Sequence, residues 1–267
     1  IKDGVRFMEV LKKAAAIKPV IVLKSGYTEA GAKAAASHTG SLAGSSKVWD
    51  GVLKQTGVLR VYTLEELLDM VVVFLYLAPP AGRRVGIVGV SGGAAVLATD
   101  EFVANGFIIP PFPDDFRSKL RSFFPTDHGT SLRNPVDLGG QVFNPGVYPA
   151  LASLANYDGV DLLIVQLSLG MLLLPPFIGE GTVLNSLADW VIRVHQETSK
   201  PLALVIHAMA SGESWEVALD CQEKCYRAGL PVYNSISGVA KAIDRFIHYC
   251  QGRELIAPGK ACFVRPD

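Results

Sequence analysis

Short apolar runs alternate with amphipathic stretches along most of this 267-residue chain, and this alternation is its strongest structural constraint. Runs without alternating polar residues are typical of strands buried on both faces, as in parallel sheets covered by helices. After residue 80, strands are predicted at residues 84–90, 107–109, 161–167, 202–206 and 230–233. Helices are predicted between them at residues 93–105, 113–123, 145–156, 182–198, 213–228 and 237–250. The fold class is therefore α/β.

The first eighty residues carry a shorter version of the same pattern. Helices are predicted at residues 5–16, 47–55 and 64–77, and strands at residues 20–23 and 58–62. Residues 25–46, rich in Gly, Ala, Ser and Thr, have no hydrophobic period and are predicted to form a loop. The Ala78-Pro79-Pro80 segment stops both helices and strands, so we place a domain boundary there.

We therefore predict two domains, residues 1–79 and 80–267, with flavodoxin-like parallel sheets covered by helices. The second domain is expected to be complete, with a C-terminal tail or linker at residues 253–267. The first offers only two strands, and because the edges of a parallel sheet need pairing or cover, we expect it to be incomplete at its N-terminus.

Composition excludes several function classes. The 25 basic and 25 acidic side chains give zero net charge with no Lys/Arg run, so nucleic acid is not expected as a partner. Apolar stretches are too short or too interrupted to span a membrane, and no export signal is visible. The four cysteines lie in the last fifth of the chain, unlike a disulfide framework. We expect a cytoplasmic protein.

A histidine lies in the small-residue string from Ser37 to Gly44. Around His38, the neighbours Ser37, Thr39 and Gly40 leave room for a bulky anion and supply hydroxyl and backbone N–H donors. Imidazole is nucleophilic near neutral pH, so His38 could accept a phosphoryl group. Residues 1–80 hold 8 Lys and 2 Arg against 3 Asp and 4 Glu, a net charge of +3 that suits an anion. The alternative is an ordinary loop histidine in a Gly-rich turn.

A second string joins a predicted strand directly to a predicted helix. Its residues Ser91, Gly92, Gly93 and Ala94 would present unpaired backbone N–H groups and the positive end of the helix dipole to an oxyanion. The string is neither G-x-G-x-x-G nor a Walker A sequence, so it does not indicate a conventional nucleotide site. A plain strand-to-helix turn explains it about equally well.

Other candidates carry less weight. Asp137, in the string Asn134-Pro135-Val136-Asp137, could cap a helix or bind a ligand, but a structural turn is favoured. Cys221 and Cys225 lie four residues apart on a predicted helix and are expected to be core thiols rather than metal ligands. His128 and His195 are expected at the surface, and no metal site is predicted.

These strings together resemble the NDP-forming acyl-CoA synthetases, the superfamily of ADP-forming acetyl-CoA synthetase and succinyl-CoA synthetase. The resemblance rests on residues 1–4, 18–26, 28–31, 37–44, 91–95 and 134–137, in the order found in the family. It implies that His38 is phosphorylated during turnover and that the helix start at Gly92, Gly93 and Ala94 holds the phosphohistidine. The family commonly has Asn-Gly-Gly-Gly or Asn-Ala-Gly-Gly there, whereas this chain has Ser91-Gly92-Gly93-Ala94.

The resemblance also implies partners and cofactors. The complete enzyme would use CoA and ADP or ATP with Mg²⁺, bound mainly outside these residues, with none bound tightly here. It would need an upstream CoA-binding domain and an ATP-grasp domain or subunit, fused or separate, and oligomers are possible. The chain alone is expected to be inactive.

The function implied is part of an enzyme that converts acyl-CoA, ADP and phosphate to carboxylate, ATP and CoA. Two alternatives stay open. One is a non-catalytic, synthetase-like regulatory module, as in some protein lysine acetyltransferases. The other is a flavodoxin-like binding domain with FMN or another small ligand at the Ser91 turn. The sequence leaves the acyl group open.

Overall fold

The computed structural model describes residues 1–39, 44–126, 129–168, 182–207 and 212–253. Its internal contacts divide the chain into two units, Ile1–Val71 and Val72–Asp267, and each is described by itself. The division falls inside helix α4 (Leu64–Tyr76). Our boundary after residue 79 stays a prediction.

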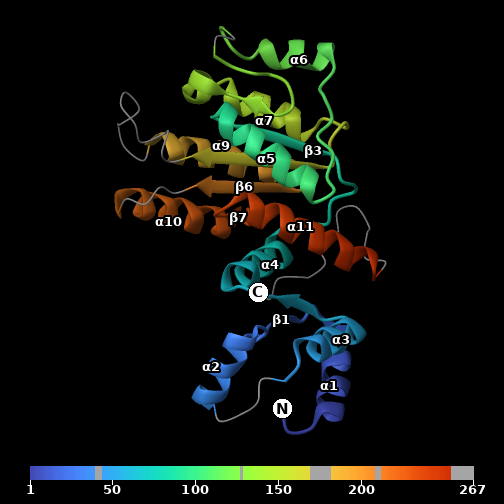
Figure 1. Ribbon diagram of the computed structural model, residues 1–267. Coiled ribbons are helices and arrows are strands. Elements are labelled where there is room, and N and C mark those ends of the chain that lie inside the picture. The colour runs from blue at the N-terminus through green and yellow to red at the C-terminus, as the bar shows by residue number, and fades with distance from the viewer. Residues whose placement is uncertain (40–43, 127–128, 169–181, 208–211, 254–267) are drawn as a thin grey trace. The chain divides into compact units, whose positions relative to one another are not determined.

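The first unit contains helices and a two-stranded parallel sheet (Figure 1). Its elements before α4 are α1 (Gly4–Ile17), β1 (Ile21–Leu23), α2 (Glu29–Thr39), α3 (Ser46–Thr56) and β2 (Leu59–Val61). In the sheet, Ile21 of β1 lies opposite Leu59 of β2. Leu11 of α1 and Leu53 of α3 are buried in a small core beside it. Apart from α2, these elements lie close to their predicted bounds.

Helix α2 corrects the sequence prediction, which treated residues 25–46 as a loop. Thr28 Oγ1 accepts a hydrogen bond from Gly31 N at 3.1 Å near the start of the helix. One turn further on, Lys33 Nζ pairs with Glu29 Oε1 at 2.8 Å. The segment is rich in alanine, the strongest helix former, and it lacks an apolar stripe. Hydrophobic periodicity therefore missed a helix that helix propensity favours.

The second unit is built on a five-stranded parallel sheet. Its strands are β3 (Val85–Gly89), β4 (Val136–Asp137), β5 (Leu162–Ser168), β6 (Leu202–His207) and β7 (Val232–Tyr233). Its helices after α4 are α5 (Gly92–Ala104), α6 (Asp114–Arg121), the 3₁₀ helix η1 (Gly139–Phe143), α7 (Val147–Ala155), α9 (Thr182–Glu197), α10 (Gly212–Arg227) and α11 (Ile236–Gln251). The spatial order β4-β3-β5-β6-β7 is the flavodoxin-like 2-1-3-4-5 arrangement. The predicted α/β class with helix-covered parallel sheets is confirmed.

Helices cover both faces of this sheet (Figure 1). α5 contacts α11 on one face, whereas α7 and α10 both contact α9 on the other. Leu163, Val165 and Leu167 of β5 belong to the core cluster that includes α7, α9 and α10. Because side chains alternate along a strand, Gln166 of β5 faces the α5 side. None of the described helices is both long and apolar enough to cross a membrane.

Two further predictions of local structure were wrong. Residues 107–109 were expected to form a strand, but Ile108 makes only an isolated bridge with Arg84. Pro110 and Pro111 follow at once, and because proline has no N–H the ladder cannot extend. Conversely, Val136 and Asp137 were read as a turn, yet they form strand β4 beside β3.

Asn134 explains why β4 lies beside β3. Its Oδ1 accepts a hydrogen bond from Ile87 N at 3.0 Å, and its Nδ2 donates to Val85 O at 2.8 Å and to Pro110 O at 3.0 Å. One side chain thus satisfies three backbone groups around the start of β3. The asparagine of the Asn134-Pro135 string has a structural role that the sequence alone did not reveal.

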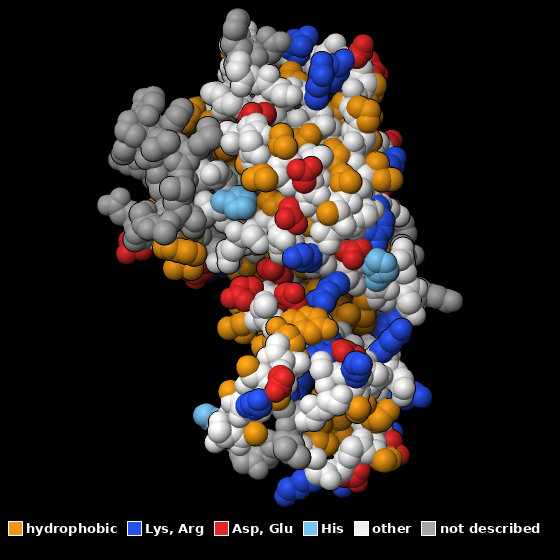
Figure 2. All heavy atoms as spheres, in the orientation of Figure 1, with side chains coloured by type: hydrophobic (Ala, Val, Ile, Leu, Met, Phe, Trp, Pro, Cys, Tyr) orange, Lys and Arg blue, Asp and Glu red, His pale blue; other side chains and the backbone are white. Residues whose placement is uncertain are grey.

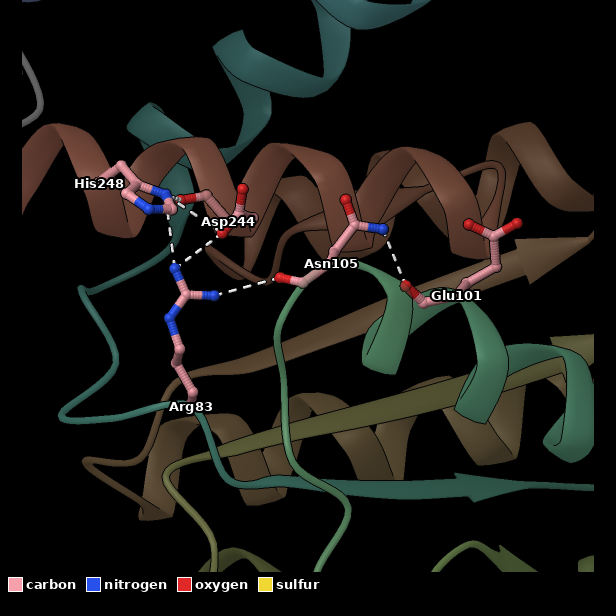
Figure 3. Close-up of polar contacts among 5 residues, drawn as sticks. All are labelled: Arg83, Glu101, Asn105, Asp244 and His248. Carbon is pink, nitrogen blue, oxygen red and sulfur yellow. Dashed lines mark hydrogen bonds and ion pairs between the residues drawn. The ribbon is translucent and has the colours of Figure 1, made fainter.

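A polar cluster fixes the C-terminal end of α5 (Figure 3). Arg83 Nη2 donates to Asp244 Oδ1 of α11 at 2.7 Å, and its Nη1 donates to the carbonyl oxygen of Asn105 at 3.2 Å. Asn105 Nδ2 in turn donates to Glu101 O at 2.8 Å, and His248 Nδ1 lies 3.4 Å from Arg83 Nη2. A cation at a helix C-terminus also interacts favourably with the helix dipole. The cluster therefore ties α5 to α11 at the end opposite Gly92.

We expect Arg83→Ala to lower the free energy of unfolding of the second unit by about 1–3 kcal/mol, because the side chains of Arg83 and Asp244 are only 25% and 24% exposed. Denaturant unfolding would measure the change. Arg227→Ala is the matched control, since Arg227 pairs with Glu223 while 79% exposed and should change stability by less than about 0.5 kcal/mol. Equal effects of the two substitutions would contradict the anchoring role of Arg83.

Candidate functional site

The start of α5 is the best-formed candidate for anion binding in the described residues. Strand β3 is buried throughout and ends at Gly89, and the N-cap residue Ser91 has extended backbone angles (φ −152°, ψ 120°). Ala95 N donates to Ser91 O at 2.9 Å and makes the first hydrogen bond of the helix. Helix geometry leaves the N–H groups of Gly92, Gly93 and Ala94 without acceptors inside the helix. The predicted Ser91–Ala94 site thus has the expected strand-to-helix geometry.

This helix start is open to an approaching group. Gly92 and Gly93 are exposed, and a β-carbon built on Gly93 would meet no atom within 4 Å. A β-carbon on Gly92 would lie 3.2 Å from Asp137 Oδ2. Asp137 Oδ1 itself accepts a hydrogen bond from Gly139 N at 3.0 Å. The exposed start of α5 therefore has one carboxylate beside it, that of Asp137 at the end of β4.

The helix start also lies at the carboxyl edge of the sheet, where the strand order reverses. β3 pairs with β4 on one side and with β5 on the other, so chain connections leave in opposite directions from β3. Ligands of doubly wound sheets bind at this switch point. The position in the topology and the unpaired N–H groups independently favour the same location.

A small recess lies against the first turn of α5. It is lined by residues from α5 and from the ends of β3, β5 and β6, namely Val90, Ser91, Ala94, Gln166, Ser168 and His207. Ser168 and His207 lie opposite each other in the β5–β6 register. Sequence reasoning missed Gln166, Ser168 and His207, and the only available signal was a glutamine in an otherwise apolar strand. Four of its six lining residues, Ser91, Gln166, Ser168 and His207, are polar.

Gln166 is 2% exposed, and neither its Nε2 nor its Oε1 has a hydrogen-bond partner within the described structure. Burying an amide without a partner costs about 1–3 kcal/mol. On the neighbouring strand, a β-carbon at Gly89 would lie 2.7 Å from Gln166 Cγ. Glycine is therefore required at position 89 to make room for the glutamine.

Surface charge adds little to the attraction for anions. Lys and Arg side chains are interspersed with Asp and Glu over the described part of the face in view, and hydrophobic side chains lie exposed over α5 (Figure 2). Val96 and Leu97 of α5 are 61% and 67% exposed. Binding of an anion at Gly92 would thus depend on local backbone and side-chain donors.

His38 lies in the other unit, in the last turn of α2, and its side chain is exposed. The hydroxyl of Ser37 donates to Ala34 O at 2.9 Å, so it is engaged within the helix. Thr39 ends α2, and Gly40 lies outside the described residues. The structure thus brings together the predicted residues Ser91–Ala94 in one unit, and places Ser37, His38 and Thr39 in another.

The cysteines behave as predicted. Cys221 and Cys225 of α10 are fully buried and share a hydrogen bond, which lowers the pKa of Cys221, while the same bond and burial raise the pKa of Cys225. These two thiols are core residues. Of the two histidines expected at the surface, His195 is half-buried on α9 and His128 lies outside the described residues.

His207 is expected to make the stability of the folded protein depend on pH. Burial disfavours the charged imidazole and lowers its pKa below the usual 6.5. As the pH falls below this usual value, the unfolded chain therefore binds a proton that the folded protein does not, and stability falls. We expect His207→Asn to lose less unfolding free energy than the wild type between about pH 7 and pH 5, measured by urea unfolding. Identical pH dependence of the two proteins would contradict this assignment.

Comparison with known proteins gives relatives over most of the chain. Residues 1–74 match the family described as succinyl-CoA ligase like flavodoxin domain. The alpha subunit of acetate–CoA ligase (ADP-forming) II from Pyrococcus furiosus is 37% identical over 242 residues, which are 91% of this chain and 50% of the relative. The corresponding subunit of enzyme I from the same organism is 35% identical over 244 residues, 91% of this chain and 49% of the relative.

A solved structure agrees with these matches. Acetyl-coenzyme A synthetase 1 of Candidatus Korarchaeum cryptofilum, described as dinucleotide forming and solved with phosphate and ADP, superposes with a TM-score of 0.72 at 26% identity. The match covers 98% of this chain and 53% of that chain. This chain thus spans about half the length of the relatives it matches.

Proposed function

We propose that this chain, as a relative of the NDP-forming acyl-CoA synthetases, forms part of an acid–thiol ligase. The proposed reaction is acyl-CoA + ADP + phosphate ⇌ carboxylate + ATP + CoA. The observation that carries the proposal is the open N-terminus of α5 at the switch point of the parallel sheet, with a polar recess against it. Such a helix start is a site for a phosphoryl group.

We divide the reaction into three steps. Phosphate attacks the thioester carbonyl, so the carbon–sulfur bond breaks and acyl phosphate and CoA form. An imidazole nitrogen of His38 then attacks phosphorus, which releases the carboxylate and leaves phosphohistidine. Finally a terminal oxygen of ADP takes the phosphoryl group, which gives ATP and regenerates the imidazole.

The exposed position of His38 at the end of α2 supports this role, since both acyl phosphate and ADP must reach its ring. A phosphohistidine carries negative charge and must also be kept from water. The first turn of α5 offers backbone N–H groups and the positive end of a helix dipole, which stabilise such an anion. We propose that Ser37, Thr39 and Gly40 flank the phosphoryl group on His38, and that Ser91, Gly92, Gly93 and Ala94 hold it during turnover.

The remaining parts of the reaction are assigned to other regions of the enzyme. We propose that CoA is held by a further CoA-binding domain, and that ADP and Mg²⁺ are held by an ATP-grasp domain or subunit. A cytoplasmic location would supply CoA and ADP directly.

Labelling tests the assignment of His38. We expect the full-length enzyme, incubated with Mg²⁺ and ATP labelled in the γ-phosphate, to incorporate label that is stable to base and lost in acid. His38→Asn should reduce this label to background, because the asparagine side chain has no nucleophilic nitrogen at neutral pH. The same substitution at another histidine, His195→Asn, should leave labelling intact. Persistent base-stable, acid-labile label in the His38→Asn enzyme would exclude His38 as the phosphorylated residue.

A further inference from the structure

The amide of Gln166, which has no hydrogen-bond partner among the described residues, points to a role beyond packing. Every other residue of β5 from Leu162 to Leu167 is a buried apolar residue, so a hydrocarbon side chain would be the ordinary choice at position 166. Gln166 is instead a polar residue, 2% exposed, with neither amide atom paired in the part of the chain described. Departures from the expected pattern of a strand are typical of functional positions.

A second departure lies directly beside it. Gly89, at the end of β3, leaves the space that Gln166 Cγ occupies, since a β-carbon there would approach it to 2.7 Å and its Nε2 to 3.0 Å. Glycine weakens a strand because it costs more conformational entropy and packs no side chain. Two adjacent strands thus each carry a destabilising residue, and together these residues keep one amide at the edge of the recess.

The amide faces the recess whose wall is the first turn of α5. Ser91 and Ala94 line the same recess, and within the described structure the Ser91 hydroxyl makes no capping hydrogen bond. The amide of Gln166 therefore lies in the same recess as Ser91 and Ala94, the two residues of the helix start that line it. All are neutral, so they can be buried without the cost of an unpaired charge.

We propose that Gln166 is a direct ligand of the phosphoryl group that binds at the start of α5, with its Nε2 donating to a phosphoryl oxygen. This inference rests on the proposed function and extends it to a residue that the sequence strings do not include. Asp137 places a carboxylate beside Gly92, which disfavours an anion. The amide of Gln166 and the hydroxyl of Ser91 supply donors on the β5 side of the turn that offset this repulsion.

Gln166→Met tests the proposal because methionine has a similar length and is apolar. With inorganic phosphate as the probe, titration calorimetry of the full-length protein should show binding about tenfold weaker in the variant, as expected for the loss of one hydrogen bond to a charged group. The thermal midpoint should stay equal or rise, because a buried unpaired amide has been removed. Gln196→Met, at an exposed position of α9, is the matched control and should change neither quantity.

Three outcomes would overturn the inference. Equal phosphate affinity of the wild type and Gln166→Met would show that the amide does not contact phosphate. A lower thermal midpoint of Gln166→Met would show that the amide is paired within the folded protein. Absence of phosphate binding by the wild type would remove the site itself. Failure of the proposed function would show in a different experiment, the labelling test, in which the wild-type enzyme would then incorporate no label at His38. The phosphate titration does not measure that label.

Discussion

The unpaired N–H groups at the start of α5 are the interaction on which the candidate site depends. Three successive peptide N–H groups, those of Gly92, Gly93 and Ala94, have no acceptor inside the helix, and Gly92 and Gly93 are exposed. A parallel sheet places such a helix start at the carboxyl edge of its strands, and the reversal of strand order beside β3 leaves that edge open. The fold therefore creates the proposed anion site before any side chain contributes.

Side chains then hold and modify that site. The Arg83 cluster ties the far end of α5 to α11, while the Asn134 side chain fixes β4 beside β3. β4 in turn carries Asp137 to the first turn of α5, where its charge opposes an anion. On the other side, Gln166 occupies the space that Gly89 leaves. If a phosphoryl group binds as proposed, the balance between one carboxylate and several neutral donors sets its affinity.

The sequence predicts most of the second unit because its strands are long apolar runs, each separated from the next by one amphipathic helix. It also predicts the Ser91 turn, since a strand that runs into two glycines and then a helix has few other geometries. Helix α2 was missed because alanine favours a helix without producing an apolar stripe. The role of Gln166 was missed for another reason. Its contact with Gly89 depends on the register of β5 against β3, which pairs residues 77 positions apart in the chain.

We propose that the first turn of α5 binds a phosphoryl group through its backbone N–H groups, and amide NMR of glycine-labelled protein can detect this binding. During titration with inorganic phosphate, the signals of Gly92 and Gly93 should shift saturably, while that of the exposed Gly252 should stay in place. Signals of Gly92 and Gly93 that do not move, or that move no more than that of Gly252, would show that phosphate does not bind at this helix start.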